Sequence, residues 1–150
     1  MARSLTQVGV GVFLLRRDGR VLLLKHKDDQ LWRCPGGGRN QGEHPIYTAH
    51  REIYEEVGIT LDERMLRQFD VDLLVHPVYG EWLTVQFFGL VPMETQGSIQ
   101  EHEIHDGLAW QKLSHIISAE HESKMFEPSY RGAIKLHSML SGIPETKSLL

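Results

Sequence analysis

Three glutamates fall within one short stretch of the chain, Arg51-Glu52-Ile53-Tyr54-Glu55-Glu56. At about 3.6 residues per helical turn, Glu52 and Glu56 are neighbours on one face and Glu55 lies close beside them. Each pair of like charges on neighbouring positions weakens a helix by roughly a few tenths of a kcal/mol, and anions near its C-terminal end oppose the helix dipole. A bound counterion removes both of these unfavourable interactions. Clustered carboxylates suit a hard divalent cation such as Mg²⁺, which binds through a few carboxylates together with substrate phosphates.

A solvated acidic surface is the alternative interpretation of this stretch, with Glu55 paired to Arg51 four residues before it. Two features favour the metal site. The glycine-rich segment Pro35-Gly36-Gly37-Gly38 precedes the helix, and glycine lets the backbone approach an anion or a metal closely. The second feature is a longer pattern that the same residues complete.

That pattern has nine defined positions over 23 residues: Gly37, five residues, Glu43, seven residues, Arg51-Glu52-Ile53, one residue, Glu55-Glu56, one residue, Gly58-Ile59. It resembles the Nudix box of the Nudix (MutT-like) hydrolase family at every defining position, and Pro35-Gly36 and Ala49 also look like the family. The resemblance implies a single Nudix hydrolase domain over residues 1–150, with the box at 37–59.

The resemblance also implies a role for each residue of the box. Glu43 and Arg51 form an ion pair that ties the loop to the helix, with Glu43 also a candidate for lying near a second metal. Gly58 ends the helix in a left-handed conformation. The catalytic metals, Mg²⁺ with Mn²⁺ as a substitute, are bound by Glu52, Glu55 and Glu56, together with the backbone carbonyl of Gly37.

The reaction implied is hydrolysis of a diphosphate linkage. Divalent cations neutralise the phosphate oxygens, lower the pKa of bound water and stabilise the leaving phosphate. A carboxylate within hydrogen-bond reach of the water removes its proton. Members of the family take this base either from the box, here Glu52, or from a later loop, where this chain offers Glu101 and Glu103. We expect Glu103 in preference to Glu101, with an exposed charged loop as the alternative for either residue.

Other candidate ligands are less sharply defined. Arg33 and Arg39 flank the glycine segment and are candidates for holding a phosphate. The alternative interpretation is that they belong to a solvated basic face. His102 and His105 could bind a transition metal, although a solvated loop is the favoured interpretation. Four aromatic residues are candidates for stacking on a base, although aromatic residues near strands are usually core: Trp32, Tyr79, Trp82 and Phe87.

The favoured substrate is a nucleoside triphosphate, cleaved to a monophosphate and pyrophosphate. The alternatives are hydrolysis of a dinucleoside polyphosphate, or of ADP-ribose or a nucleotide sugar, at the same site. A catalytically silent Nudix-fold binding module is the non-enzyme alternative, and the complete set of box glutamates argues against it.

Composition narrows the remaining possibilities. A chain of 150 residues with 41% hydrophobic and 24% charged residues fits one soluble globular domain. The net charge of −4 disfavours a nucleic-acid partner, and the single cysteine, Cys34, fits a reducing compartment. We find no apolar run that spans a bilayer and no secretory leader. We therefore expect a cytoplasmic monomer or homodimer that binds a small-molecule nucleotide, with no nucleic-acid or membrane partner.

Periodicity predicts the elements that position these residues. Residues 7–15 alternate as a strand, and Gly9 and Gly11 on one of its faces leave room for close approach, by a packed helix in our preferred interpretation or by a ligand. Asp18-Gly19 predicts a hairpin turn into a buried strand at 21–24.

The pattern after the glycine segment changes to that of a helix. Apolar residues recur at spacings of three and four over 45–57, between Pro45 and Gly58. Three strands are predicted at about 69–75, 82–91 and 108–113, then a helix at 130–140 and a flexible tail at 143–150. The predicted fold class is α/β, a Nudix-type α/β/α sandwich with a mixed sheet between helices.

Overall fold

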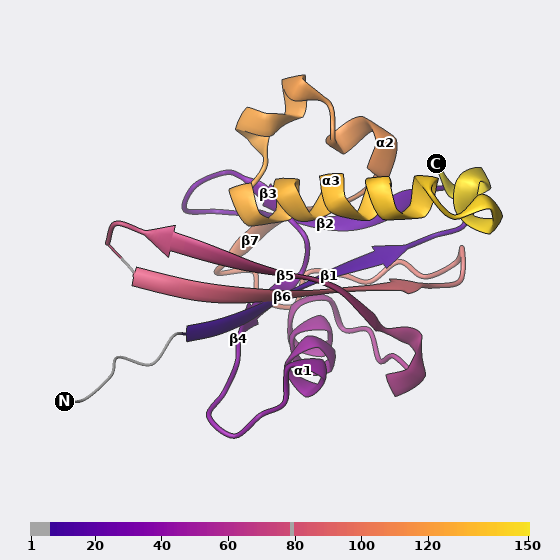
Figure 1. Ribbon diagram of the computed structural model, residues 1–150. Coiled ribbons are helices and arrows are strands. Elements are labelled where there is room, and N and C mark those ends of the chain that lie inside the picture. Colours follow the sequence, from indigo (N-terminus) through magenta and orange to yellow (C-terminus); the bar gives the residue numbers. More distant parts are fainter. Residues whose placement is uncertain (1–6, 79) are drawn as a thin grey trace.

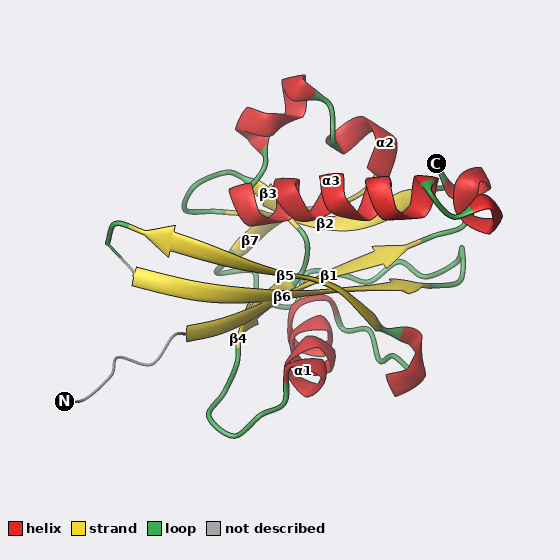
Figure 2. Cartoon of the chain, in the orientation of Figure 1, coloured by secondary structure: helices red, strands yellow, loops and turns green. Residues whose placement is uncertain are grey.

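The computed structural model describes residues 7–78 and 80–150. Within these ranges a mixed seven-stranded sheet lies between helices, with α1 (Pro45–Val57) on one face and α3 (Glu127–Ser141) on the other (Figure 1, Figure 2). The predicted α/β/α sandwich with a mixed sheet is therefore confirmed.

The sheet has the strand order β3-β2-β1-β6-β5, with β4 paired to β1 and β7 paired to β2. β1 and β6 run parallel, from Gln7 opposite Trp82 to Leu15 opposite Leu90, and the other pairs are antiparallel. The strands are β1 (Gln7–Leu15), β2 (Arg20–His26), β3 (Trp32–Arg33), β4 (Gly36–Gly38), β5 (Arg67–His76), β6 (Gly80–Leu90) and β7 (His105–Lys112).

Helix α1 has the predicted bounds because both ends carry specific signals. Pro45 lies in its first turn, where the missing N–H costs no helical hydrogen bond. Gly58 caps the other end with a φ of 71°, a left-handed conformation, and its N–H donates to the Tyr54 carbonyl at 3.0 Å. The predicted structural role of Gly58 agrees with this geometry.

Two hydrophobic cores fix the two helices to the sheet. The core under α1 joins its buried residues Ala49, Ile53 and Val57 to one face of β1 and β2, including Val10, Val12, Leu14, Leu22 and Leu24. The core under α3 joins Ala133, Leu136 and Leu140 to the opposite face, including Phe13, Leu15, Val21 and Leu23. Because the residues of β1 alternate between these cores, its register holds both helices in place.

The C-terminal segment differs from the predicted flexible tail. Residues Pro144–Leu149 form the 3₁₀ helix η3, Leu149 is buried in the core under α3, and the Thr146 hydroxyl donates to the Leu140 carbonyl. The other short helices are η1 (Glu63–Met65), α2 (Leu113–Ile116) and η2 (Ala119–Lys124). None of the described helices is long and apolar enough to cross a membrane.

Candidate active site

The glycine segment forms strand β4, which lies between β1 and α1. A side chain at Gly36 would collide with the Val10 carbonyl, and one at Gly37 would collide with the Glu52 carboxylate. The Gly36 N–H donates to Glu56 Oε1 at 2.8 Å. Glycine at these two positions therefore lets the backbone of β4 lie directly against β1 and the carboxylates of α1.

Glu43 and Arg51 form an ion pair, here called the clamp, that ties the loop before α1 to the helix. Arg51 Nε lies 2.9 Å from Glu43 Oε2 and Arg51 Nη2 lies 3.0 Å from Glu43 Oε1, a two-point contact. Thr48 Oγ1 also donates to Glu43 at 2.7 Å. The hydrogen bond from Arg51 holds the pKa of Glu43 at about 2, and the same contact raises the pKa of Arg51. The predicted ion pair is present.

Glu56 is in the opposite situation. Its side chain is 7% exposed and its carboxylate lies against the sheet, where it accepts the Gly36 N–H. Burial raises the pKa of Glu56 to about 9, and the charges of Glu52 and Glu101 add to the rise. The hydrogen bond from Gly36 lowers this pKa, but by less than burial raises it. Without a bound cation, the surroundings of Glu56 therefore disfavour its charged form.

The other two glutamates of the helix differ from each other in exposure. Glu52 is 13% exposed, and burial raises its pKa even though Arg51 Nη1 lies 3.1 Å away. Glu55 is 47% exposed and also lies 3.1 Å from Arg51 Nη1. Both line the same cleft as Glu56, so the helix presents its three glutamates to one space, as predicted.

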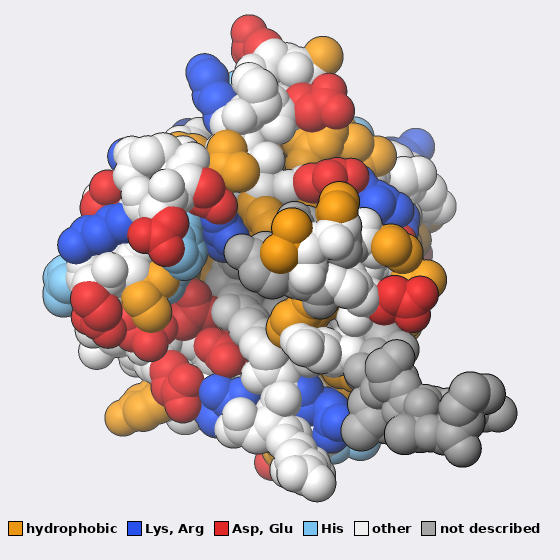
Figure 3. Space-filling model, turned by 90° about the vertical axis from the view of Figure 1, so that its left-hand side faces the viewer, with side chains coloured by type: hydrophobic (Ala, Val, Ile, Leu, Met, Phe, Trp, Pro, Cys, Tyr) orange, Lys and Arg blue, Asp and Glu red, His pale blue; other side chains and the backbone are white. Residues whose placement is uncertain are grey.

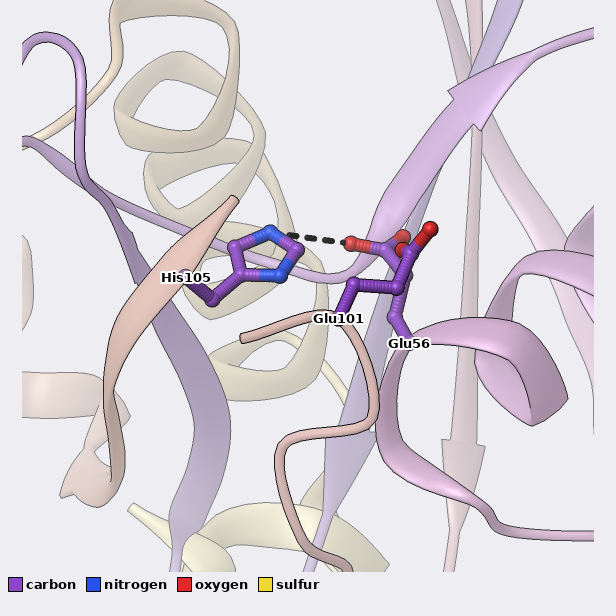
Figure 4. A group of neighbouring side chains, drawn as sticks. All are labelled: Glu56, Glu101 and His105. Atoms are coloured by element: carbon purple, nitrogen blue, oxygen red, sulfur yellow. Dashed lines mark ion pairs between the residues drawn. The ribbon is translucent and has the colours of Figure 1, made fainter. Parts of the chain in front are cut away.

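The loop before β7 and the first residue of β7 bring two more groups to Glu56. Glu56, Glu101 and His105 each have a potential metal-ligand atom, and these three atoms lie within 4.8 Å of one another. We call these three residues the Glu56 cluster. His105 Nε2 lies 3.3 Å from Glu56 Oε2 (Figure 4). Burial lowers the pKa of His105, and the neighbouring His26 and Arg33 add to this effect.

The position of Glu101 changes the expectation about the later loop. Glu101 is half-buried and lines the cleft, whereas Glu103 is exposed and is not among the residues that line it. Burial and the nearby charges of Glu103 and Glu55 raise the pKa of Glu101. The geometry thus favours Glu101 over our preferred Glu103. The expectation of a solvated loop is also wrong for His105, which is buried, while His102 is exposed.

These groups lie in one cleft of about 780 Å³. Figure 3 shows the hollow, with acidic side chains gathered on one side of it and hydrophobic side chains on the other. The residues that supply apolar surface to the lining include Leu74, Trp82, Phe126 and Pro128. A volume of this size with one charged end and one apolar wall suits a small molecule that has both kinds of group.

A family model described as NUDIX domain matches residues 5–132. The chain belongs to the NUDIX family. An RNA pyrophosphohydrolase of Mannheimia succiniciproducens is 45% identical over 51 residues, which are 34% of this chain and 26% of that protein. The match thus spans about a quarter of that relative's length.

Two solved structures share the Nudix fold over most of both chains. A MutT NUDIX hydrolase from Burkholderia pseudomallei has a TM-score of 0.75 at 23% identity, with 89% of this chain and 99% of that chain covered. The E. coli dihydroneopterin triphosphate pyrophosphohydrolase has a TM-score of 0.69 at 22% identity, with 91% and 99% covered. The enzyme class expected from the sequence, a hydrolase of phosphorus anhydrides, is the class of these relatives.

The two candidate arginines of this Nudix protein are placed differently. Arg33 lines the cleft, where its guanidinium lies 4.2 Å from the centre of the Phe126 ring and pairs with Asp29. Arg39 is exposed, donates to the Glu43 carbonyl at 3.1 Å, and is not among the residues that line the cleft. Only Arg33 is placed to meet a ligand in the cleft.

Of the four aromatic candidates, Trp82 lines the cleft, and Phe87 is buried in the core under α1. Trp32 packs against the core under α3, and Tyr79 lies outside the described residues. Gln86 and Ser129 line the cleft as well, and no spacing in the sequence pointed to them.

The preferred interpretation of Gly9 and Gly11 is wrong. Both line the cleft, and a side chain at Gly9 would meet the Gly37 carbonyl and the Trp82 ring rather than a packed helix. A side chain at Gly11 would meet Cys34 Sγ at 3.1 Å. The small residues of β1 keep the cleft open at the sheet.

The donor set of the Nudix site fits a divalent cation. Glu52, Glu56 and Glu101 bring carboxylate oxygens into one cleft. Within the described part of the chain, no arginine or lysine forms an ion pair with Glu56, and its surroundings disfavour its charge. His105 Nδ1 is buried and has no hydrogen-bond partner among residues 7–78 and 80–150. A cation bound here would turn the repulsion among these groups into attraction.

Proposed function

We propose that this Nudix protein is a metal-dependent pyrophosphohydrolase that converts a nucleoside triphosphate to a monophosphate and pyrophosphate. The observation that carries the proposal is the meeting of Glu52, Glu56 and Glu101 at one cleft with an apolar wall. An anionic substrate is repelled by these carboxylates unless a cation lies between them, so the same arrangement demands both a metal and a phosphate.

Each group of the cleft then has a task. Glu52, Glu55 and Glu56 hold the cations, Mg²⁺ with Mn²⁺ as a substitute. When bound, these ions neutralise the phosphate oxygens, make water a better nucleophile and stabilise the leaving group. Glu101, close to Glu56 but outside the helix, accepts the proton of the attacking water.

The rest of the cleft positions the substrate. Arg33 lines the cleft, so its guanidinium is placed to donate to a phosphate. Trp82 offers an aromatic face to the base. Water adds to the α-phosphorus, the bond from that phosphorus to the bridging oxygen breaks, and pyrophosphate leaves with the electron pair.

The relatives support this choice of substrate class. One structural relative carries the name of a dihydroneopterin triphosphate pyrophosphohydrolase and one sequence relative that of an RNA pyrophosphohydrolase, so both names describe loss of pyrophosphate. A free triphosphate is favoured here because the net charge is −4, and a long polyanion gains affinity mainly from a basic surface.

The test is a panel of substrates with Mg²⁺, in which the products are separated by chromatography. The panel contains the nucleoside triphosphates, a dinucleoside polyphosphate, ADP-ribose and a 5′-triphosphorylated RNA. We expect a monophosphate and pyrophosphate from a nucleoside triphosphate, and in ¹⁸O-labelled water the label should enter the monophosphate. Diphosphate and inorganic phosphate as the products would contradict the proposal, and no turnover of any compound would favour a binding module.

A further inference from the structure

His105 is a buried histidine that faces the acidic side chains of the cleft. Its side chain is 4% exposed, and Figure 4 shows its ring directed toward Glu56, with Glu101 beside the pair. Nδ1 is buried and has no hydrogen-bond partner within the described part of the chain. Buried polar atoms without a partner are rare, and a bound ion is one of the standard reasons for them.

The loop holds Glu101 and His105 together before any ligand binds. The backbone N–H groups of Ile104 and His105 both donate to the Glu101 carbonyl at 3.0 Å, which forms a tight turn. The His26 ring packs edge-on against His105, with 5.6 Å between ring centres. Because the turn and this contact fix the imidazole, the cluster is organised in advance, as a metal site requires.

We propose that His105 is a nitrogen ligand of a divalent cation held by Glu56 and by one oxygen of Glu101, whose other oxygen is left to accept the proton of the attacking water, so that this position takes a first-row transition ion such as Mn²⁺ in preference to Mg²⁺. The inference rests on the proposed function for the presence of a cation at Glu56. It goes further in naming a ligand outside the box and the kind of ion that the ligand selects.

The spacing and chemistry of the three groups fit one ion. Their ligand atoms all lie within 4.8 Å of one another. Metal–ligand bonds of about 2.0–2.3 Å place the ligands of one ion no more than about 4–5 Å apart. Imidazole suits first-row transition ions, whereas Mg²⁺ takes oxygen ligands and keeps several of its waters. One nitrogen beside two carboxylates therefore favours the transition ion.

The direct test uses the whole protein with substoichiometric Mn²⁺ and electron spin echo spectroscopy, which detects nitrogen bound to the metal. We expect ¹⁴N modulation from a coordinated imidazole, replaced by the ¹⁵N pattern when the protein carries ¹⁵N-histidine. Bound Mn²⁺ without nitrogen coupling would overturn this inference and leave the proposed function standing. Failure to bind Mn²⁺ would overturn this inference, and failure to bind Mg²⁺ as well would overturn the proposed function.

Variants then assign the nitrogen. His105→Gln should abolish the coupling and weaken Mn²⁺ binding by at least about tenfold, since even residues outside the coordination sphere contribute about 10–100-fold. Mg²⁺ affinity should change little. His102→Gln, on the exposed part of the same loop, is the matched control and should keep the coupling. If His105→Gln lost Mn²⁺ and Mg²⁺ affinity equally, His105 would only position the other ligands, and the inference would be overturned.

Discussion

The clamp and the Glu56 cluster each contain a glutamate of the region around helix α1, Glu43 and Glu56, yet the pKa values of these two carboxylates are shifted in opposite directions. Glu43 of the clamp accepts hydrogen bonds from Arg51 and Thr48, and its pKa is held at about 2. Glu56 lies deeper, where burial raises its pKa to about 9 and the charges of Glu52 and Glu101 add to the rise. Arg51 supplies the cation for Glu43, whereas no arginine or lysine among residues 7–78 and 80–150 forms an ion pair with Glu56.

This difference separates structure from function within a single sequence motif. Glu43 is held by a two-point contact with Arg51 and ties the loop to the helix, so it stabilises the fold. A buried carboxylate held beside other carboxylates destabilises the metal-free protein, which is typical of a site that awaits a cation. We therefore propose that the clamp belongs to the scaffold and the Glu56 cluster to the chemistry.

The largest expected effect comes from Glu56→Gln. A bound cation contributes several kcal/mol to charge stabilisation in the transition state, so turnover should fall by at least about 10³-fold. The fold should persist because Gln can still accept the Gly36 N–H and removes a like-charge repulsion. Steady-state kinetics and thermal unfolding measure the two effects, and excess EDTA should match the variant's loss of rate. Full activity in EDTA would refute the metal-dependent mechanism.

The next effect separates the two glutamates of the later loop. If Glu101 is the general base, Glu101→Gln should lower kcat by at least about 10²-fold, the smaller end of what such catalysis contributes. Glu103→Gln is the control, because Glu103 is exposed and lies two residues after Glu101 on the same loop. Its kcat should stay within a few-fold of the wild-type value. The opposite ranking would return the role to Glu103, and two silent variants would return it to Glu52.

A smaller effect is expected for the arginines. Arg33→Gln should raise KM for the triphosphate by about tenfold, because a hydrogen bond to a charged group contributes about 1.5–3 kcal/mol. Arg39 is not among the residues that line the cleft, so Arg39→Gln removes no hydrogen bond to the substrate and should leave KM within about twofold of the wild-type value. Comparable changes in the two variants would mean that their effect is general electrostatics rather than contact with a phosphate.

The smallest effect concerns stability at the clamp. The pKa of Glu43 is lowered from an ordinary 4.5 to about 2, so its charge stabilises the fold above about pH 4.5, and this contribution is lost as pH falls toward 2. Glu43→Gln should lower the free energy of unfolding by about 1–2 kcal/mol at pH 7 and by less in acid.

Urea denaturation at neutral and acidic pH measures the difference. Glu127→Gln is a suitable control because Glu127 is 69% exposed and lies 3.8 Å from Arg131, a contact that should contribute little. A cost for Glu43→Gln that does not shrink with falling pH would contradict the assignment of the clamp.

The elements with strong local signals were predictable from sequence. The apolar stripe between Pro45 and Gly58 gave α1 its observed bounds, and strict alternation did the same for β1. β4 was missed because three glycines carry no alternation, and their strand exists through pairing with β1. The order of the last eight residues was missed because it depends on Leu149 reaching a core built from distant segments.

The site was predictable to the same degree. The box residues could be placed because a helix fixes the relation of Glu52, Glu55 and Glu56. Which side chain of the later loop enters the cleft depends on the turn at Glu101, and spacing alone does not specify that turn. β7 also begins at His105, three residues before the predicted strand, because it pairs there with His26 of β2. This long-range pairing buries His105.

The most direct test of the central claim is calorimetric titration of Mg²⁺ and Mn²⁺ into the wild type, Glu56→Gln and Glu43→Gln. If the Glu56 cluster is the cation site and the clamp is structural, Glu56→Gln should weaken binding by at least about tenfold. Glu43→Gln should bind both ions within a few-fold of wild type. Wild-type affinity in Glu56→Gln, or an equal loss in Glu43→Gln, would contradict the division between the two regions.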